Sequence, residues 1–346
     1  MRLLKTKMMD KIKFDHLFRL TDSTGIFQHA SFGIPDFSKG YTTDDNSRAL
    51  CVALNLFKLT HDPRFLNISE TYISFLKYVQ RDDGWWHNYI GYNREYLDDI
   101  GSEDAFGRAF MCISYAFSIC NEKRFNSNSR EMLNRAYPNI LSIRSPRAIS
   151  FVIIGLKYLV QKGFGENVIK TMKIMSDRLC ECYYNTKKSD WYWFENIIAY
   201  SNGSLPASLL FAYSVLNEEK YLNIGLETLN FLTQNLFEEG YLKIIGNNGW
   251  WIYGKSKAEF DEQPVDAGSM VLAYKVAKEI TGSNDFDKYL HLSWEWFFGK
   301  NSLSKSLYDE ETGGCLDGIT RYGVNENEGS ESLLSLLGSY IIINNA

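Results

Sequence analysis

The sequence predicts an all-α fold in which six helical hairpins close into a ring, an (α/α)6 toroid. Three observations predict it: a helix start that recurs at hairpin-sized spacing, short turns to a partner helix, and long loops back to the next repeat. The six starts are marked by Asp44, Asp104, Pro146, Pro206, Asp266 and Ser330, which lie 60, 42, 60, 60 and 64 residues apart. We therefore expect one domain over residues 1–346, with residues 1–40 supplying the helix and loop that complete the ring.

The first repeated helix begins in the stretch YTTDDNSRAL, residues 41–50. Thr42 or Thr43 can cap this helix. Asp44 and Asp45 then lie in its first turn, where free backbone N–H groups and the positive end of the helix dipole favour negative charge. A His-Asp-Pro break follows at about residue 61 and predicts the end of the helix.

The later repeats open with similar small-residue starts. They read SEDAFGRA from residue 102, SPRA from 145, LPAS from 205, VDAGS from 265 and EGSES from 328. Partner helices are expected to begin near residues 65, 125, 166, 220 and 285, and the segment up to about residue 20 supplies the sixth. Small residues such as Ala53 and Gly107 allow close helix packing, so we place the repeated helices inside and their partners outside.

Loop length indicates which end of the ring is functional. Turns from inner to outer helices are short, whereas most connections back inward are long. The long connections cover about residues 81–102, 185–204, 238–264 and 299–327. All of them gather at the N-terminal ends of the inner helices, which we call the mouth, and long ordered loops on a rigid scaffold commonly carry binding and catalysis.

Composition excludes several classes of function. The chain has 346 residues, 45% of them hydrophobic, and a net charge of −5 without a basic run, which disfavours nucleic acid and membrane surfaces as partners. No apolar run is long enough for a signal peptide or a membrane span, so we expect a cytoplasmic protein. The six cysteines and five histidines lack metal-ligand spacing, and no phosphate-binding loop is present. We expect no cofactor and no metal.

The mouth loops are rich in aromatic residues. Candidate substrate-binding side chains there are Trp85, Trp86, Trp191, Trp193 and Trp251, together with His87. Flat aromatic faces beside carboxylates suit sugar rings, whose C–H faces stack while their hydroxyls form hydrogen bonds. The alternative is that these tryptophans seal the loops onto the end of the ring.

Carboxylates recur at the same mouth, and glycoside cleavage commonly needs two of them. Glu195 lies among aromatic residues that would raise its pKa, which suits a general acid. Asp45 and Asp104 begin inner helices, where the dipole should keep them ionised as a base, although the roles could be exchanged. Asp44, Asp266 and Glu262 are the further candidates for binding substrate. Each acid alone could equally be a helix cap or a loop ion pair.

Five sequence blocks carry a resemblance to a known family. They are YTTDDNSRA from residue 41, SEDAFGRA from 102, WYWFE from 191, FDEQPVDA from 260 and GGCLDG from 313. The chain resembles a bacterial (α/α)6-toroid family of the glycosidase superfamily type, whose members often carry a glycosyltransferase label. The resemblance implies a six-hairpin toroid and a carbohydrate substrate, mannose-containing glycans included. Ser201, the pair Gly203-Ser204, and Glu328 depart from the family pattern.

These observations favour a glycoside hydrolase acting on a short oligosaccharide. The first alternative is another sugar reaction on the same ring, such as phosphorolysis, epimerisation or uronate elimination. Toroid epimerases rely on histidine pairs, and this chain has few mouth histidines. The second alternative is a non-catalytic glycan-binding module that associates with a glycosyltransferase. The pair Asp82-Asp83 also suggests a terpene-cyclase toroid. We rank this class lower, because the residues around these aspartates in the mouth loops are polar and do not form a continuous apolar pocket.

Overall fold

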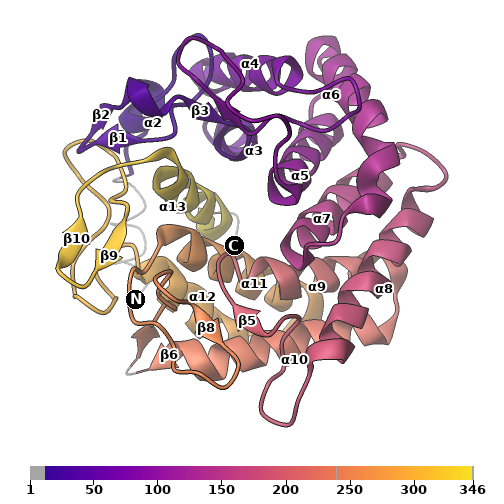
Figure 1. Cartoon of the computed structure of the whole chain (residues 1–346), viewed down its shortest axis with the longest axis vertical. Coiled ribbons are helices and arrows are strands. Elements are labelled where there is room, and N and C mark those ends of the chain that lie inside the picture. Colours follow the sequence, from indigo (N-terminus) through magenta and orange to yellow (C-terminus); the bar gives the residue numbers. More distant parts are fainter. Residues whose placement is uncertain (1–11, 239, 345–346) are drawn as a thin grey trace.

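The computed structural model describes residues 12–238 and 240–344 and contains a ring of helices in two layers (Figure 1). The inner helices are α3 (Thr43–Thr60), α5 (Glu103–Ile119), α7 (Pro146–Lys162), α9 (Ser204–Leu216), α11 (Pro264–Thr281) and α13 (Ser330–Asn344). The outer helices are α2 (Asp15–Arg19), α4 (Pro63–Tyr78), α6 (Lys123–Ala136), α8 (Val168–Thr186), α10 (Glu219–Leu236) and α12 (Asp285–Glu295). The predicted (α/α)6 toroid is confirmed, and the predicted helix starts lie within three residues of the observed ones.

Each inner helix packs against the next, and α13 packs against α3 to close the ring. The core lies between the two layers, where the apolar faces of inner and outer helices meet. Gly107 shows why the inner helices carry small residues: a Cβ there would lie 2.9 Å from the carbonyl oxygen of Ala148 on α7. No helix within the described ranges is both long and apolar enough to span a membrane. Residues 1–11, which bear on the expected absence of a signal peptide, lie outside those ranges.

The helix starts follow the expected capping chemistry. The hydroxyl of Thr42 accepts a hydrogen bond from the backbone N–H of Asp45 at 3.0 Å, and Ser102 accepts one from Ala105 at 3.1 Å. Thr42 is therefore the residue that caps α3, as one of the two expected candidates. Capping by these side chains leaves the carboxylates of the first turn free to face the mouth.

The mouth loops contain short antiparallel strands and two 3₁₀ turns that the sequence did not predict. The strand pairs are β1 (Ala30–Ser31) with β2 (Ile34–Pro35), β3 (Tyr41–Thr42) with β4 (Tyr89–Ile90), β5 (Ile197–Ile198) with β8 (Trp251–Ile252), β6 (Phe237–Glu238) with β7 (Tyr241–Leu242), and β9 (Gly318–Thr320) with β10 (Gly323–Asn325). The 3₁₀ turns are η1 (Phe37–Lys39) and η2 (Tyr137–Ser142). Two of these pairs, β3–β4 and β5–β8, tie neighbouring mouth loops together, because they join segments that precede different inner helices.

Candidate functional site

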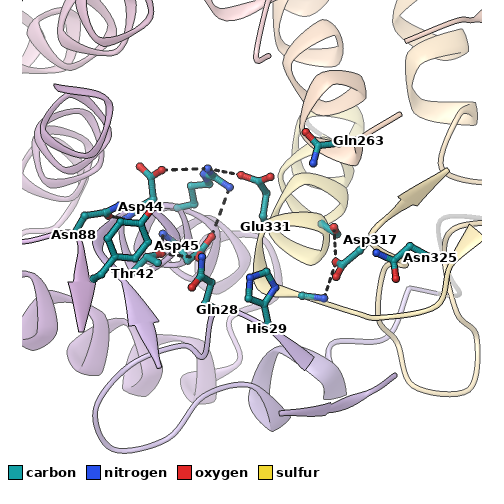
Figure 2. A pocket seen from close by; sticks show the side chains of 14 residues that line it. Gln28, His29, Thr42, Asp44, Asp45, Asn88, Gln263, Asp317, Asn325 and Glu331 are labelled. Carbon is teal, nitrogen blue, oxygen red and sulfur yellow. Dashed lines mark hydrogen bonds and ion pairs between the residues drawn. The ribbon is translucent and has the colours of Figure 1, made fainter. Parts of the chain in front are cut away.

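A polar cavity of about 260 Å³ opens at the mouth between α3 and α13. Figure 2 shows Asp44, Asp45 and Glu331 gathered on one side of this cavity, with His29 and Asp317 along another. Its lining residues are Gln28, His29, Thr42, Asp44, Asp45, Arg48, Asn88, Tyr89, Gln263, Asp317, Asn325, Gly329, Glu331 and Ser332. The first and last inner helices therefore supply Asp44, Asp45 and Glu331, and the loop before α13 supplies Asp317.

One guanidinium group, that of Arg48, holds three carboxylates in this cavity. Its Nη2 lies 2.7 Å from Oε2 of Glu331 and 3.7 Å from Oδ2 of Asp44, and its Nη1 lies 3.6 Å from Oδ1 of Asp45. A second cation approaches from α5, where Nε of Arg108 lies 3.3 Å from Oδ1 of Asp44. Three acids thus share two arginines, which leaves the cluster short of one positive charge when all the acids are ionised.

The environment separates the pKa values of these acids. Burial raises the pKa of Asp45 to about 6, against the opposing effect of Arg48. Burial also acts on Glu331, but Arg48 and Arg108 outweigh it and hold its pKa below the usual range. Burial of Asp45, which is only 4% exposed, therefore shifts its pKa in the direction opposite to the one expected from the helix dipole. Asp45 and Glu331 thus have pKa values shifted in opposite directions.

The opposite wall of the cavity is built from the loop before α13. Oδ1 of Asp317 accepts hydrogen bonds from the backbone N–H of Gly329 and the hydroxyl of Ser332, both at 2.8 Å. Burial raises the pKa of Asp317 despite these two donors. The side chain of His29 is exposed beside it. This wall can offer hydrogen-bond acceptors and one titratable ring to a ligand.

A second acidic cluster lies at the starts of α5 and α7. Arg147 donates to Oε2 of Glu195 at 2.5 Å and to the backbone oxygen of Tyr200 at 2.8 Å. The phenol of Tyr200 donates to Oδ2 of Asp104 at 2.6 Å, and Ser145 donates to Oδ1 at 3.2 Å. Glu195 and Asp104 are thus brought together through Arg147 and Tyr200. Neither lines the cavity that contains Asp45.

Asp266 begins α11 and is buried, with 5% of its surface exposed. Burial raises its pKa to about 7, against the backbone N–H groups of Ser201 and Asn202. Its Oδ2 has no hydrogen-bond partner among the residues the structure describes, and the same holds for Oδ1 of Asn202. Asp266 is a protonatable group in the inner wall of the mouth.

Most of the predicted aromatic binding residues are structural. Trp86, Trp191 and Trp193 are at most 1% exposed, and Trp86 donates its indole N–H to the backbone oxygen of Leu76 at 3.0 Å. Trp85 packs on Phe106 and Trp251 on Trp191, with ring centroids 4.9 Å apart in both pairs, and neither lines the cavity. The prediction that these indoles face a sugar is wrong for the three buried residues. They seal the loops onto the ring, as the alternative reading held.

Two other predicted binding residues are occupied by neighbouring side chains. Glu262 is fully buried and contacts Nζ of Lys243 at 3.0 Å and the hydroxyl of Ser302 at 2.6 Å. The ring of His87 stacks on Tyr96 at 4.0 Å. The prediction for Glu262 is wrong, because this side chain has no exposed surface with which to bind substrate. His87 lies outside the cavity lining, and its role in binding stays a prediction.

Several cavity residues were not among the predicted site residues. Tyr89 pairs with Thr42 across β3 and β4, which turns both side chains toward the cavity, and it is 49% exposed. Asn88 precedes it and accepts a hydrogen bond from the backbone N–H of Asp44 at 3.3 Å. Tyr89 lies in the aromatic connection 81–102, and Asp317 lies in the GGCLDG block. Both segments had been singled out in the sequence, although these two residues had not. No group of three or more metal-ligating side chains occurs within the described part of the chain.

Comparisons with known proteins identify the fold. No family model matches this chain, and no curated protein matches it in sequence. Among solved structures, a sugar epimerase from a ruminal bacterium matches with a TM-score of 0.77 and 13% identity, covering 99% of both chains. The cellobiose 2-epimerase from Bacillus thermoamylovorans matches with a TM-score of 0.79 and 10% identity, covering 100% of both.

A third similar structure is an α-1,6-mannanase from Salegentibacter, with a TM-score of 0.69, 11% identity and 99% of both chains covered. An inactive variant of that mannanase, in which two consecutive aspartates are replaced, was solved in complex with α-1,6-mannotetrose and matches with a TM-score of 0.66, 11% identity and coverage of 98% of this chain and 97% of that one. These likenesses establish the architecture: this chain has the six-hairpin toroid found in enzymes that act on sugars.

Proposed function

We propose that this protein is a glycoside hydrolase that cleaves a short, mannose-containing oligosaccharide in the polar cavity of the mouth. One observation carries the proposal: Asp45 and Glu331 flank the same arginine, yet the pKa of one is raised and that of the other is lowered. Glycoside cleavage uses such a pair, one carboxyl group protonated and the other ionised.

In this proposal Asp45 donates its proton to the oxygen of the leaving group. Glu331, whose side chain is 43% exposed, activates water or attacks the anomeric carbon. Arg48 favours the ionised form of Glu331, while burial raises the pKa of Asp45 to about 6, so the protonated form of Asp45 is most abundant at mildly acidic pH. The sugar hydroxyls would bind Asp44, Asn88 and Asp317, and a sugar face would stack on Tyr89.

The second acidic cluster takes a supporting role in this proposal. Asp266 and Arg147 present buried polar atoms that lack hydrogen-bond partners among the described residues, and such atoms can bind the hydroxyls of an adjoining sugar. Glu195 and Asp104 would orient Arg147 and Tyr200. The arrangement with Glu195 as acid and Asp104 as base is the competing assignment, and variants of each pair distinguish the two.

The mannanase among the structural neighbours supports the choice of substrate. Its inactive variant lacks two consecutive aspartates and holds an α-1,6-mannotetrose. This chain carries consecutive acids at the starts of two inner helices, Asp44-Asp45 on α3 and Glu103-Asp104 on α5. A mannose oligosaccharide is therefore the first substrate to assay.

Epimerisation is the second candidate, because epimerases have the same fold and His29 lines the cavity. A base and an acid are both needed to move a proton at carbon, and His29 is the one histidine of five in the cavity lining; all five lie in the described ranges. Incorporation of deuterium from heavy water into unhydrolysed sugar would identify epimerisation. Release of a shorter glycan would identify hydrolysis.

The test is incubation of the full chain with a panel of mannose-containing and other oligosaccharides, followed by chromatography and calorimetry. Hydrolysis predicts release of reducing sugar that requires no phosphate, which separates it from phosphorolysis. Tight binding with no product across the panel would contradict the proposal and favour a glycan-binding module that accompanies a glycosyltransferase.

A further inference from the structure

A second cavity of about 190 Å³ lies along the axis of the ring, deeper than the mouth. All six inner helices contribute to its lining, and most of the lining side chains are apolar, including Val52, Phe151, Leu272 and Leu334. Small residues of α11 and α13 leave this space open between the helices. It is chemically unlike the polar cavity above it.

Arg48 lines both cavities and lies between them. Cys51 and Val52 follow Arg48 by about one turn of α3, so the apolar lining begins roughly 5 Å further along the helix. Arg108 lies at the same boundary: its guanidinium is 4.2 Å from the ring centroid of Phe151 and its Nε is 3.3 Å from Asp44. The acids that would act on a glycosidic bond therefore stand directly over an apolar space.

The volume limits what this space can hold. An apolar space of about 150 Å³ is large enough for benzene. The axis cavity, as we call this space, therefore has room for one aromatic ring or a short branched alkyl group.

We propose that the axis cavity binds the apolar aglycone of a small glycoside, an aryl or short alkyl group, while the sugar occupies the mouth. The placement of the sugar rests on the proposed function, whereas the placement of the aglycone rests on the axis cavity alone. The glycosidic oxygen would then lie beside Arg48, within the cluster that contains Asp45 and Glu331.

Gly338 offers a direct way to fill the cavity. It lies on α13 in the cavity lining, and a Cβ built there meets no neighbouring atom within 4 Å. Gly338→Leu should therefore occupy the space without a clash at Cβ, and Gly338→Ala should occupy less of it. Gly165 is the matched control, because a Cβ there also meets nothing within 4 Å and the residue lies between α7 and α8, outside the cavity.

The first experiment measures binding of phenol, a stand-in for the aglycone, by ligand-detected NMR and thermal shift. We expect phenol to bind the natural chain and the Gly165→Leu variant equally, to bind Gly338→Ala more weakly, and to bind Gly338→Leu at least about tenfold more weakly. Equal phenol affinity in folded Gly338→Leu or Gly338→Ala would overturn the proposal. This measurement needs no turnover.

The second experiment compares phenyl and methyl mannosides of both anomers as competing ligands. We expect the phenyl compound to bind at least about fivefold better, and Gly338→Leu to remove that preference. Phenol binding without a phenyl preference would overturn the assignment of the cavity to an aglycone. Failure of every glycoside to be hydrolysed would contradict the proposed function and leave the phenol result standing.

Discussion

The mouth contains two acidic sectors that look alike in sequence and differ in structure. In the α3–α13 sector, Arg48 holds Asp44, Asp45 and Glu331 beside an open cavity. In the α5–α7 sector, Arg147 pairs with Glu195, and the phenol of Tyr200 covers Asp104.

The difference shows that a count of carboxylates identifies the end of the ring where acids gather but not the sector in which they line an open cavity. Accessibility depends on what the loops place over each acid. The phenol of Tyr200 satisfies Asp104, and Trp250 lies against Tyr200 with ring centroids 5.9 Å apart. In the other sector Glu331 keeps nearly half of its side chain exposed.

The largest expected effect is on turnover. Asp45→Asn and Glu331→Gln should each lower kcat by about 10²- to 10⁴-fold, because each removes a group to which the proposed function assigns proton transfer. Asp104→Asn and Glu195→Gln should lower it less, because these groups act through Arg147 and Tyr200.

The measurement is steady-state hydrolysis of the best oligosaccharide from the panel. Glu70→Gln is the matched control, because Glu70 pairs with Arg124 on the outer helices. Larger losses in Glu195→Gln and Asp104→Asn than in Asp45→Asn and Glu331→Gln would reverse the assignment of the two sectors.

Stability should also distinguish the sectors. Arg48→Met leaves three carboxylates without their shared cation and should lower the free energy of unfolding by about 3 kcal/mol. Arg147→Met leaves one carboxylate, Glu195, which is 24% exposed and can be hydrated, and the backbone oxygen of Tyr200 without this donor, and should lower the free energy of unfolding by about 1–2 kcal/mol. Urea unfolding followed by circular dichroism measures both. A larger loss of stability for Arg147→Met than for Arg48→Met would contradict the difference between the two sectors.

The raised pKa values predict how stability depends on pH. Asp45 and Asp266, with pKa values of about 6 and 7, hold protons in the folded state at a pH where the unfolded chain has released them. The free energy of unfolding should therefore fall as pH rises from 5 to 8, with about 2 kcal/mol of the fall due to Asp266.

Asp266→Asn should flatten this pH dependence, whereas Glu70→Gln should not. Urea unfolding across the pH series measures it. A variant curve as steep as that of the natural chain would show that Asp266 does not titrate in this range.

The smallest effect concerns the aromatic groups. Tyr89→Ala should weaken oligosaccharide binding by about three- to tenfold, because Tyr89 lines the open cavity with half of its surface exposed. Trp251→Phe should leave the affinity unchanged, since Trp251 packs against Trp191 outside the cavity. Calorimetry measures both, and a larger loss for Trp251→Phe would move the binding surface to the other sector.

Local patterns were sufficient to predict the ring. Helix starts, caps and short turns depend on neighbouring residues, so the cap at Thr42 and the six inner helices could be predicted from the sequence. The role of Gly107 in close helix packing follows the same logic, because small residues in a repeated helix signal a near neighbour.

The partners of the site residues could not be predicted in this way. Arg48 meets Glu331 only because α13 closes the ring against α3, and the two lie near opposite ends of the chain. Trp191 and Trp193 are buried because β5 pairs with β8 and draws two loops together, and no local pattern indicates that pairing. The effect of burial on Asp45 and Asp266 could not be read from their helix positions either.

The closure of the ring at α3 and α13 has a consequence for the protein during its synthesis. The ribosome makes Asp44, Asp45 and Arg48 early and Glu331 near the end, so a nascent chain holds one half of the cavity until α13 emerges. Contacts between such distant segments form late, because the intervening chain must first be ordered. A chain released before α13 would lack Glu331, so the cavity between α3 and α13 can be complete only after the last helix has left the ribosome.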